Sequence, residues 1–316
     1  MDIKETRESL ELRHKYDEAC KRLLANKEIL AQILKACVEE YKDCNVYDIA
    51  DKYIEGTPEV SKEDIHRDAE YSDIVGLNTE DSSVSEGTFR FGILFKAKLP
   101  DSGDEIGLII NIEAQNKYNA GYPLIKRGIY YCSRIISSQY RRYFEKSHYE
   151  NLKKVYSIWI CINVPEERKN TVTRYRITEQ NIIGNAKEDK VNYDLINVVM
   201  VCLGDKNHKD YKGILKFLDV LLKSTQRQER QETLVDEFGL RMDSDLGREV
   251  SGMCNLSEGI LERGIEQGIE QGIERGIEKT LINAFNSGMN IAAMKAFSGL
   301  SENEIRCILK AKGYDI

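Results

Sequence analysis

The sequence has little of several features that define common protein classes. Its 316 residues include four prolines, four histidines and one tryptophan, and its eight cysteines contain no C-x-x-C pair. The histidines lack metal-ligand spacing, and no glycine-rich phosphate loop follows a predicted strand. Zinc sites of ordinary spacing, disulfide frameworks and nucleotide-binding loops are therefore not indicated, and reduced, buried thiols are expected.

Long apolar runs are also scarce. The two most apolar segments, VYSIWICINV and GILKFLDVLL, are far shorter than the roughly 20 residues that a membrane-spanning helix needs. The N-terminus, MDIKETRESLELRHK, lacks the apolar run of a signal peptide. With 41% hydrophobic and 31% charged residues, we expect a cytoplasmic protein with one main domain and a tail.

Hydrophobic periodicity predicts a mixed α/β core. Residues 16–41 have apolar side chains at helical spacing and no Gly or Pro, which indicates one helix or a helical pair. Apolar residues alternate in 89–99 and 106–115, which predicts a hairpin of two half-buried strands closed between Leu99 and Ile106. A helix over 122–146 starts near Pro123, and two apolar strands and a further helix follow.

The last part of the chain has a different pattern. Residues 264–279 are four tetrads, GIEQ GIEQ GIER GIEK, which predict a helix whose isoleucine stripe precesses around the axis. Each interior glycine costs about 1 kcal/mol relative to alanine, so an isolated helix would be marginal and homo-oligomerisation as a coiled coil is expected. Residues 281–316 predict helices separated by turns. Their charge favours a packing or oligomerisation module over a DNA-reading helix-turn-helix.

Glu113 and Gln115 are two residues apart on one predicted strand. Their side chains therefore project from the same sheet face, where a hard metal ion could be held. Taken alone, an E-x-Q pair is equally typical of the solvent-exposed polar face of a half-buried strand.

Several segments together resemble the PD-(D/E)XK nuclease family transposases, also called recombination-promoting nucleases. The resemblance rests on RLLANKEILAQILK, IINIEAQN, GYPLIKRGIYYCSRIISSQY, VYSIWICIN and the GIEQ tetrads. It implies a restriction-endonuclease-like fold, a mixed sheet flanked by helices, with an extended helical C-terminal tail. The expected divisions are a helical part of the core at 1–50, the nuclease-like core at 51–225, a connector at 226–258, a repeat helix at 259–280 and a helical module at 281–316.

The resemblance also implies a Mg²⁺-dependent DNA endonuclease with named site residues. Glu113 corresponds to the acidic metal ligand and Gln115 replaces the lysine of the family name. The hairpin register predicts that paired residue numbers sum to 205, which places Gly92 opposite Glu113 and Arg90 opposite Gln115. Gly92 thus occupies the position where the family has an aspartate, and the site is expected to be degenerate.

Two explanations of Gly92 remain open at this point. The metal site has lost a ligand and with it hydrolysis, or Gly92 is a strand bulge and another acid replaces the aspartate. The loop acids Asp101, Asp104 and Glu105 are too far along the strand in this register. The acids that could approach from elsewhere are Asp73, Asp81, Glu39 and Glu40.

A basic segment follows the E-x-Q strand. Residues 117–154 contain nine Lys and Arg but two acids, a local charge of +7 in a chain of net charge −7. Eight aromatic residues lie among them, which favours DNA binding through phosphate contacts over a plain solvated helix face. The predicted DNA-binding residues are Lys126, Arg127, Tyr130, Tyr131, Arg134, Arg141 and Arg142. Three functions stay open: a Mg²⁺-dependent DNA endonuclease, a DNA-binding pseudonuclease and an oligomeric scaffold.

Overall fold

A computed structural model describes residues 7–60, 80–83, 87–90, 92–100, 106–119, 121–224 and 226–314. The chain divides into a larger unit, Leu10–Ser257, and a smaller unit that contains Glu258–Ile316. Among the described residues, no helix combines the length and apolar character needed to cross a bilayer.

The larger unit is built on a mixed six-stranded sheet of order β1-β4-β5-β6-β8-β7. Strands β5, β6 and β8 are parallel, and β4 and β7 pair with them in antiparallel fashion. This arrangement confirms the predicted mixed α/β core. The strands are β1 (Glu59–Val60), β4 (Ile93–Lys98), β5 (Ile106–Lys117), β6 (Lys154–Asn163), β7 (Thr171–Arg176) and β8 (Ile196–Cys202).

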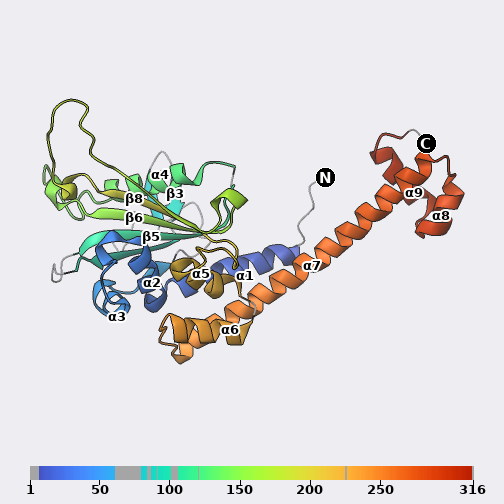
Figure 1. The fold of residues 1–316 in the computed structure, drawn as a ribbon. Coiled ribbons are helices and arrows are strands. Elements are labelled where there is room, and N and C mark those ends of the chain that lie inside the picture. The colour runs from blue at the N-terminus through green and yellow to red at the C-terminus, as the bar shows by residue number, and fades with distance from the viewer. Residues whose placement is uncertain are drawn as a thin grey trace. The chain divides into compact units, whose positions relative to one another are not determined.

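Helices cover both faces of this sheet. In Figure 1, α2 and α5 lie on one side and α4 lies on the other, against β6 and β8. The segment 16–41 forms a helical pair, because the Asn26 side chain accepts the Glu28 N–H and caps a new helix. The helices are α1 (Arg7–Leu24), α2 (Lys27–Cys37), α3 (Val46–Asp48), α4 (Leu124–Ser137), α5 (Gly213–Lys223) and α6 (Arg227–Glu232). Short 3-10 and π turns include η1 (Glu39–Tyr41), η2 (Ile49–Tyr53) and η6 (Thr233–Glu237).

The predicted strand over 89–99 is two strands instead of one. Strand β3 (Gly87–Arg90) pairs with β2 (Glu80–Ser83) in a separate two-stranded sheet, and β4 begins only at Ile93. Arg90 stands opposite Glu80, so its predicted pairing with Gln115 is wrong. Alternating apolar residues run through both strands, and the sequence pattern therefore gave no sign of the break near Gly92.

Strand β5 is buried on both faces, whereas the sequence predicted one solvated face. Leu108, Ile110 and Ile112 pack on the side of α2 and α5, and Ile109 and Asn111 are equally buried on the α4 side. The reason is topological: β5 is flanked by β4 and β6, and α4 returns across the sheet.

Helix α4 is shorter than the predicted span of 122–146. It starts at Leu124 with Pro123 at the N-cap, as predicted, and ends at Ser137. The buried Gln139 side chain then bonds to both the N–H and the C=O of Lys153, which holds the following turns in place. Arg141 and Lys146 adopt positive φ in those turns, so Arg141 and Arg142 do not extend the face of α4.

The smaller unit contains the end of a long helix and two short ones. Helix α7 (Ser244–Asn286) includes all four tetrads, and α8 (Ile291–Ser298) and α9 (Glu302–Ala311) follow it. Gly299 caps α8 with φ 73°, and Ser301 and Glu304 form a capping box at α9. These elements confirm the predicted succession of helices and turns, and Leu281, Met294, Ile305 and Leu309 form their core.

Candidate functional site

The β4–β5 register places Gly92 opposite Glu113. Paired residues from Ile93↔Ile112 to Ala97↔Leu108 keep the predicted sum of 205, and the Gly92 N–H donates to Glu113 Oε1 at 2.6 Å. The predicted register beside Gly92 is therefore confirmed, and its assignment to the family's aspartate position stays a prediction. The hairpin nevertheless closes with Lys98↔Ile106, because a bulge lies between Ala97 and Lys98. This irregularity is five residues away from Gly92, which lies just before β4, and the explanation of Gly92 as a strand bulge stays a hypothesis.

A side chain at position 92 has no room in this backbone. A Cβ atom there would lie 2.6 Å from the Ile112 carbonyl oxygen and 3.0 Å from Glu113 Oε2. Real Cβ atoms essentially never approach backbone oxygen so closely. Glycine at position 92 therefore has two effects. It supplies no side-chain metal ligand, and it lets its own amide approach the Glu113 carboxylate closely.

The surroundings of the Glu113 carboxyl group favour its protonated, neutral form. Burial raises the pKa of Glu113 to about 6, although the Gly92 N–H and the Arg127 guanidinium act in the opposite direction. The carboxyl group is still ionised at neutral pH, but it titrates well above an exposed glutamate.

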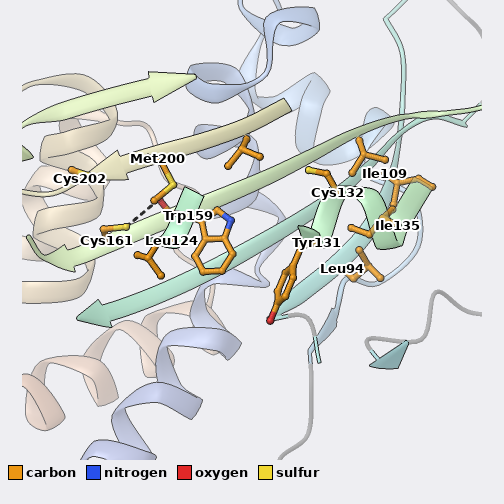
Figure 2. Close-up of a cluster of buried hydrophobic side chains, with 12 residues drawn as sticks. Leu94, Ile109, Leu124, Tyr131, Cys132, Ile135, Trp159, Cys161, Met200 and Cys202 are labelled. Carbon is orange, nitrogen blue, oxygen red and sulfur yellow. Dashed lines mark hydrogen bonds between the residues drawn. The ribbon is translucent and has the colours of Figure 1, made fainter. Parts of the chain in front are cut away.

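Arg127 is held in position by aromatic residues at the start of α4. Its Nε and Nη2 donate to the Tyr131 hydroxyl at 3.0 and 2.5 Å, and its Nη1 donates to the Tyr122 hydroxyl at 2.8 Å. The guanidinium also lies 5.4 Å from the centroid of the Trp159 ring. Figure 2 shows Tyr131 and Trp159 within the buried cluster. Tyr131 is 4% exposed, so it supports Arg127 and its ring is not available to stack on DNA.

A buried polar chain continues from Glu113 beneath α4. Asn111 Nδ2 and Trp159 Nε1 both donate to the Ser157 hydroxyl, at 3.2 and 2.9 Å. Asn111 is fully buried and its Oδ1 has no hydrogen-bond partner. The sequence placed Asn111 on the face of Glu113, but Ser157 and Trp159 were missed. Ser157 and Trp159 share one face of VYSIWICIN, but the sequence does not show which strand lies beside this one.

A protein-family model matches part of the chain. Residues 97–247 match the family model described as PD-(D/E)XK nuclease family transposase. This segment belongs to that family. The match includes Glu113, Gln115 and all of α4, whereas Gly92 precedes it. No curated protein and no solved structure shows significant similarity to the chain.

PD-(D/E)XK nucleases generally use divalent metal ions. The positions of the acids that could bind such an ion together with Glu113 are therefore important. Glu40 accepts from Lys154 and Tyr156, and Glu39 is engaged with cations of β7, so neither joins Glu113. Asp81 belongs to β2, and Asp73, Asp101, Asp104 and Glu105 lie outside the described residues. Within the part of the chain that the structure describes, no group of three His, Cys, Asp or Glu could hold a metal ion.

The donor set around Glu113 fits a Mg²⁺ ion poorly. Among the described residues it offers one carboxylate, of which Oε1 already accepts the Gly92 N–H, and the Asn111 amide oxygen. Gln115 follows two residues further along the same face of β5. Mg²⁺ prefers charged oxygen ligands in near-octahedral geometry. The described residues of this PD-(D/E)XK domain therefore support no hydrolytic step through a metal ion.

The predicted DNA-binding residues do not form one helix face. Lys126 and Tyr130 are exposed on α4, while Arg127 and Arg134 are partly buried. Arg141 and Arg142 are exposed in the turns after α4. Lys126, Tyr130, Arg141 and Arg142 are the exposed members of the predicted set, and they are called the exposed basic surface below.

Proposed function

We propose that this nuclease-like domain binds duplex DNA through Lys126, Tyr130, Arg141 and Arg142, and that its cleavage of phosphodiesters is severely impaired. The observation that supports the impairment is the Gly92 amide bonded to Glu113, the one carboxylate at this site among the residues that the structure describes. Metal-assisted cleavage needs a cation that activates water and neutralises charge on the phosphate. With Glu113 as the carboxylate that the described residues supply, little of that cation would be held.

The exposed basic surface supports the DNA-binding part. Three exposed cations and an exposed tyrosine lie on α4 and the turns after it, within the segment that matches the family model. Such contacts reach phosphates and not base edges, so binding should be independent of sequence and steeply dependent on salt.

Cleavage is tested by nicking of supercoiled DNA in Mg²⁺ and in Mn²⁺ by the native chain and by Glu113→Ala. We expect no nicking above that of the variant with either ion. Nicking by the native chain that Glu113→Ala abolishes would show an active endonuclease and overturn the proposed impairment.

DNA binding is tested by gel retardation of a duplex at low salt. Charge reversal of Lys126, Arg141 and Arg142 together should weaken binding by more than about tenfold and reduce the salt slope by roughly 0.9 per lost phosphate contact. Reversal of Lys15, Arg22 and Lys209, which are exposed residues outside this surface, is the matched control. Equal retardation by both triple variants would show that the basic surface is wrongly assigned.

We also propose that the chain self-associates through α7. Ile269 and Ile273 are each 59% exposed, and added Cβ atoms at Gly268, Gly272 and Gly276 would meet nothing within 4 Å. An exposed isoleucine stripe beside open glycines allows close helix contact. Sedimentation of the full chain should give an oligomer that Ile269→Ser with Ile273→Ser converts to monomer. A native chain that sediments as a monomer at high concentration would contradict this.

A further inference from the structure

A cavity of about 580 Å³ lies between the end of α2 and the edge of the sheet. One wall comes from α2 and η1, and the other comes from β7 and β8. Its lining residues are Ala36, Cys37, Val38, Glu39, Lys42, Val172, Arg174, Arg176 and Val199. This size is typical of sites for small molecules, which are commonly 300 to 1,000 Å³ in volume.

The cavity is on the sheet face opposite Glu113. Arg174 pairs with Val199, which has Ile158 and then Ile112 as neighbours across the sheet. Glu113, one residue further along β5, belongs to the α4 side. The cavity is therefore separate from the candidate site at Glu113.

Glu39 is the centre of a cluster of cations at this cavity. Its Oε2 accepts from Arg174 Nη1 at 3.0 Å and from Arg176 Nη1 at 2.9 Å, and its Oε1 accepts from Lys190 Nζ at 3.0 Å. Lys190 is also 3.6 Å from the buried Asp194. Lys42 adds a further positive charge to the lining.

One carboxylate does not use the hydrogen-bonding capacity of two guanidinium groups. Each arginine has five N–H donors in a planar fork that matches phosphate oxygens, and Glu39 accepts one bond from each. Arg174 Nη2 donates to the Cys37 carbonyl, and its buried Nε has no partner. The charged groups of the lining itself sum to a positive value, with two Arg and one Lys against one Glu.

The remaining wall is apolar. Ala36, Val38, Val172 and Val199 line the cavity beside the arginines. Low-dielectric walls strengthen the attraction between the cations and a bound anion. They also offer a surface for an uncharged part of the same ligand.

We propose that this cavity binds a small molecule with a phosphate monoester group, which Arg174 and Arg176 hold while its organic part lies against Val38, Val172 and Val199. The two arginines present their forks from neighbouring same-face positions of β7, and Lys42 lies at the cavity as a further cation. Glu39 holds the arginines in place but also opposes the ligand's charge.

The experiment is isothermal titration of the full chain with adenosine 5′-monophosphate and, separately, with inorganic phosphate. The native chain should bind adenosine 5′-monophosphate, and Arg176→Gln should weaken binding by about tenfold or more, the usual loss for a charge-assisted bond. Arg22→Gln, at an exposed arginine of α1 outside the cavity, should bind as the native chain does. Glu39→Gln should bind more tightly, because the competing carboxylate is gone.

The two probes distinguish the sources of the phosphate. Tighter binding of the nucleotide than of inorganic phosphate supports contact with the apolar wall, and equal binding limits the ligand to phosphate itself. Absence of binding by either probe, or equal affinity of the native chain and Arg176→Gln, would overturn the proposed site. Weaker binding by Glu39→Gln would also overturn the proposed site. That result would mean that the carboxylate only keeps the arginines ordered and does not compete with the ligand.

Discussion

Two glutamates on opposite faces of the same sheet have opposite surroundings. Glu113 is partly buried with one backbone donor, and burial raises its pKa to about 6. Glu39 has three cations within 3.0 Å of its oxygens, and the Lys190 bond together with the nearby arginines lowers its pKa. The Glu113 carboxylate thus has few charged partners, whereas Glu39 is the centre of an ion cluster. Family membership alone does not show where an anion binds.

The largest effect is expected at Gly92, where a carboxylate would make the Glu113 face more like a metal site. Gly92→Asp should lower the free energy of unfolding by about 2 to 4 kcal/mol, because its Cβ meets the Ile112 carbonyl and its charge meets Glu113. Gly92→Ala, the control, keeps the Cβ clash without the charge and should lose about 1 to 3 kcal/mol. Urea unfolding measures both. A Gly92→Asp protein with native stability that nicks DNA would show that the backbone can adapt.

The next effect concerns the raised pKa of Glu113. A carboxyl with a raised folded pKa adds stability at pH below its unfolded value near 4.5, and this stability is lost as the pH rises through about 6. Glu113→Gln retains an acceptor for the Gly92 N–H. Relative to this variant, the native chain should therefore gain about 1 to 2 kcal/mol between pH 7.5 and pH 4.5. A constant difference across this range, measured by urea unfolding, would mean that the carboxyl group titrates normally.

A smaller effect on DNA binding is expected for a single cation, and it should differ between the α4 face and the cavity face of the sheet. Lys126→Gln should weaken retardation of duplex DNA by about threefold to tenfold at low salt, since it removes one phosphate contact. Arg176→Gln removes the same charge from the opposite face and should leave DNA retardation unchanged. If both substitutions weaken DNA binding alike, the cavity face also contacts DNA and the two faces are not independent.

The smallest effect is expected for Glu39. Its lowered pKa contributes stability above the unfolded value near 4.5, and this contribution is lost as the pH falls through the lower folded pKa. Glu39→Gln should cost less than about 1 kcal/mol at pH 7, because solvent screens these half-exposed ion pairs. The difference from the native chain should shrink on acidification below pH 4.5, opposite in direction to that of Glu113→Gln.

Much of the Glu113 site followed from local sequence pattern. Strand alternation placed Asn111, Glu113 and Gln115 on one face, and the register rule placed Gly92 across from Glu113. These features depend on residues close in sequence, or on one hairpin.

The features that the sequence did not predict depend on distant segments. Ser157 and Trp159 reach Asn111 because β6 lies parallel beside β5, and alternation within one strand does not name its neighbour. Glu39 meets Arg174 and Arg176 across more than 130 residues of chain. Likewise α4 ends early because Gln139 bonds to the backbone of Lys153, which no helix propensity encodes.

The bulge between Ala97 and Lys98 has a consequence for how this hairpin tolerates change. On the side of the hairpin tip, Lys98 pairs with Ile106. On the other side of the bulge, Ala97 pairs with Leu108, so Gly107 is the extra residue. An insertion or deletion near the tip can therefore be absorbed by gaining or losing such an unpaired residue, without sliding the rest of the ladder. Chains that differ in tip length can thereby keep the same amide beside the same carboxylate.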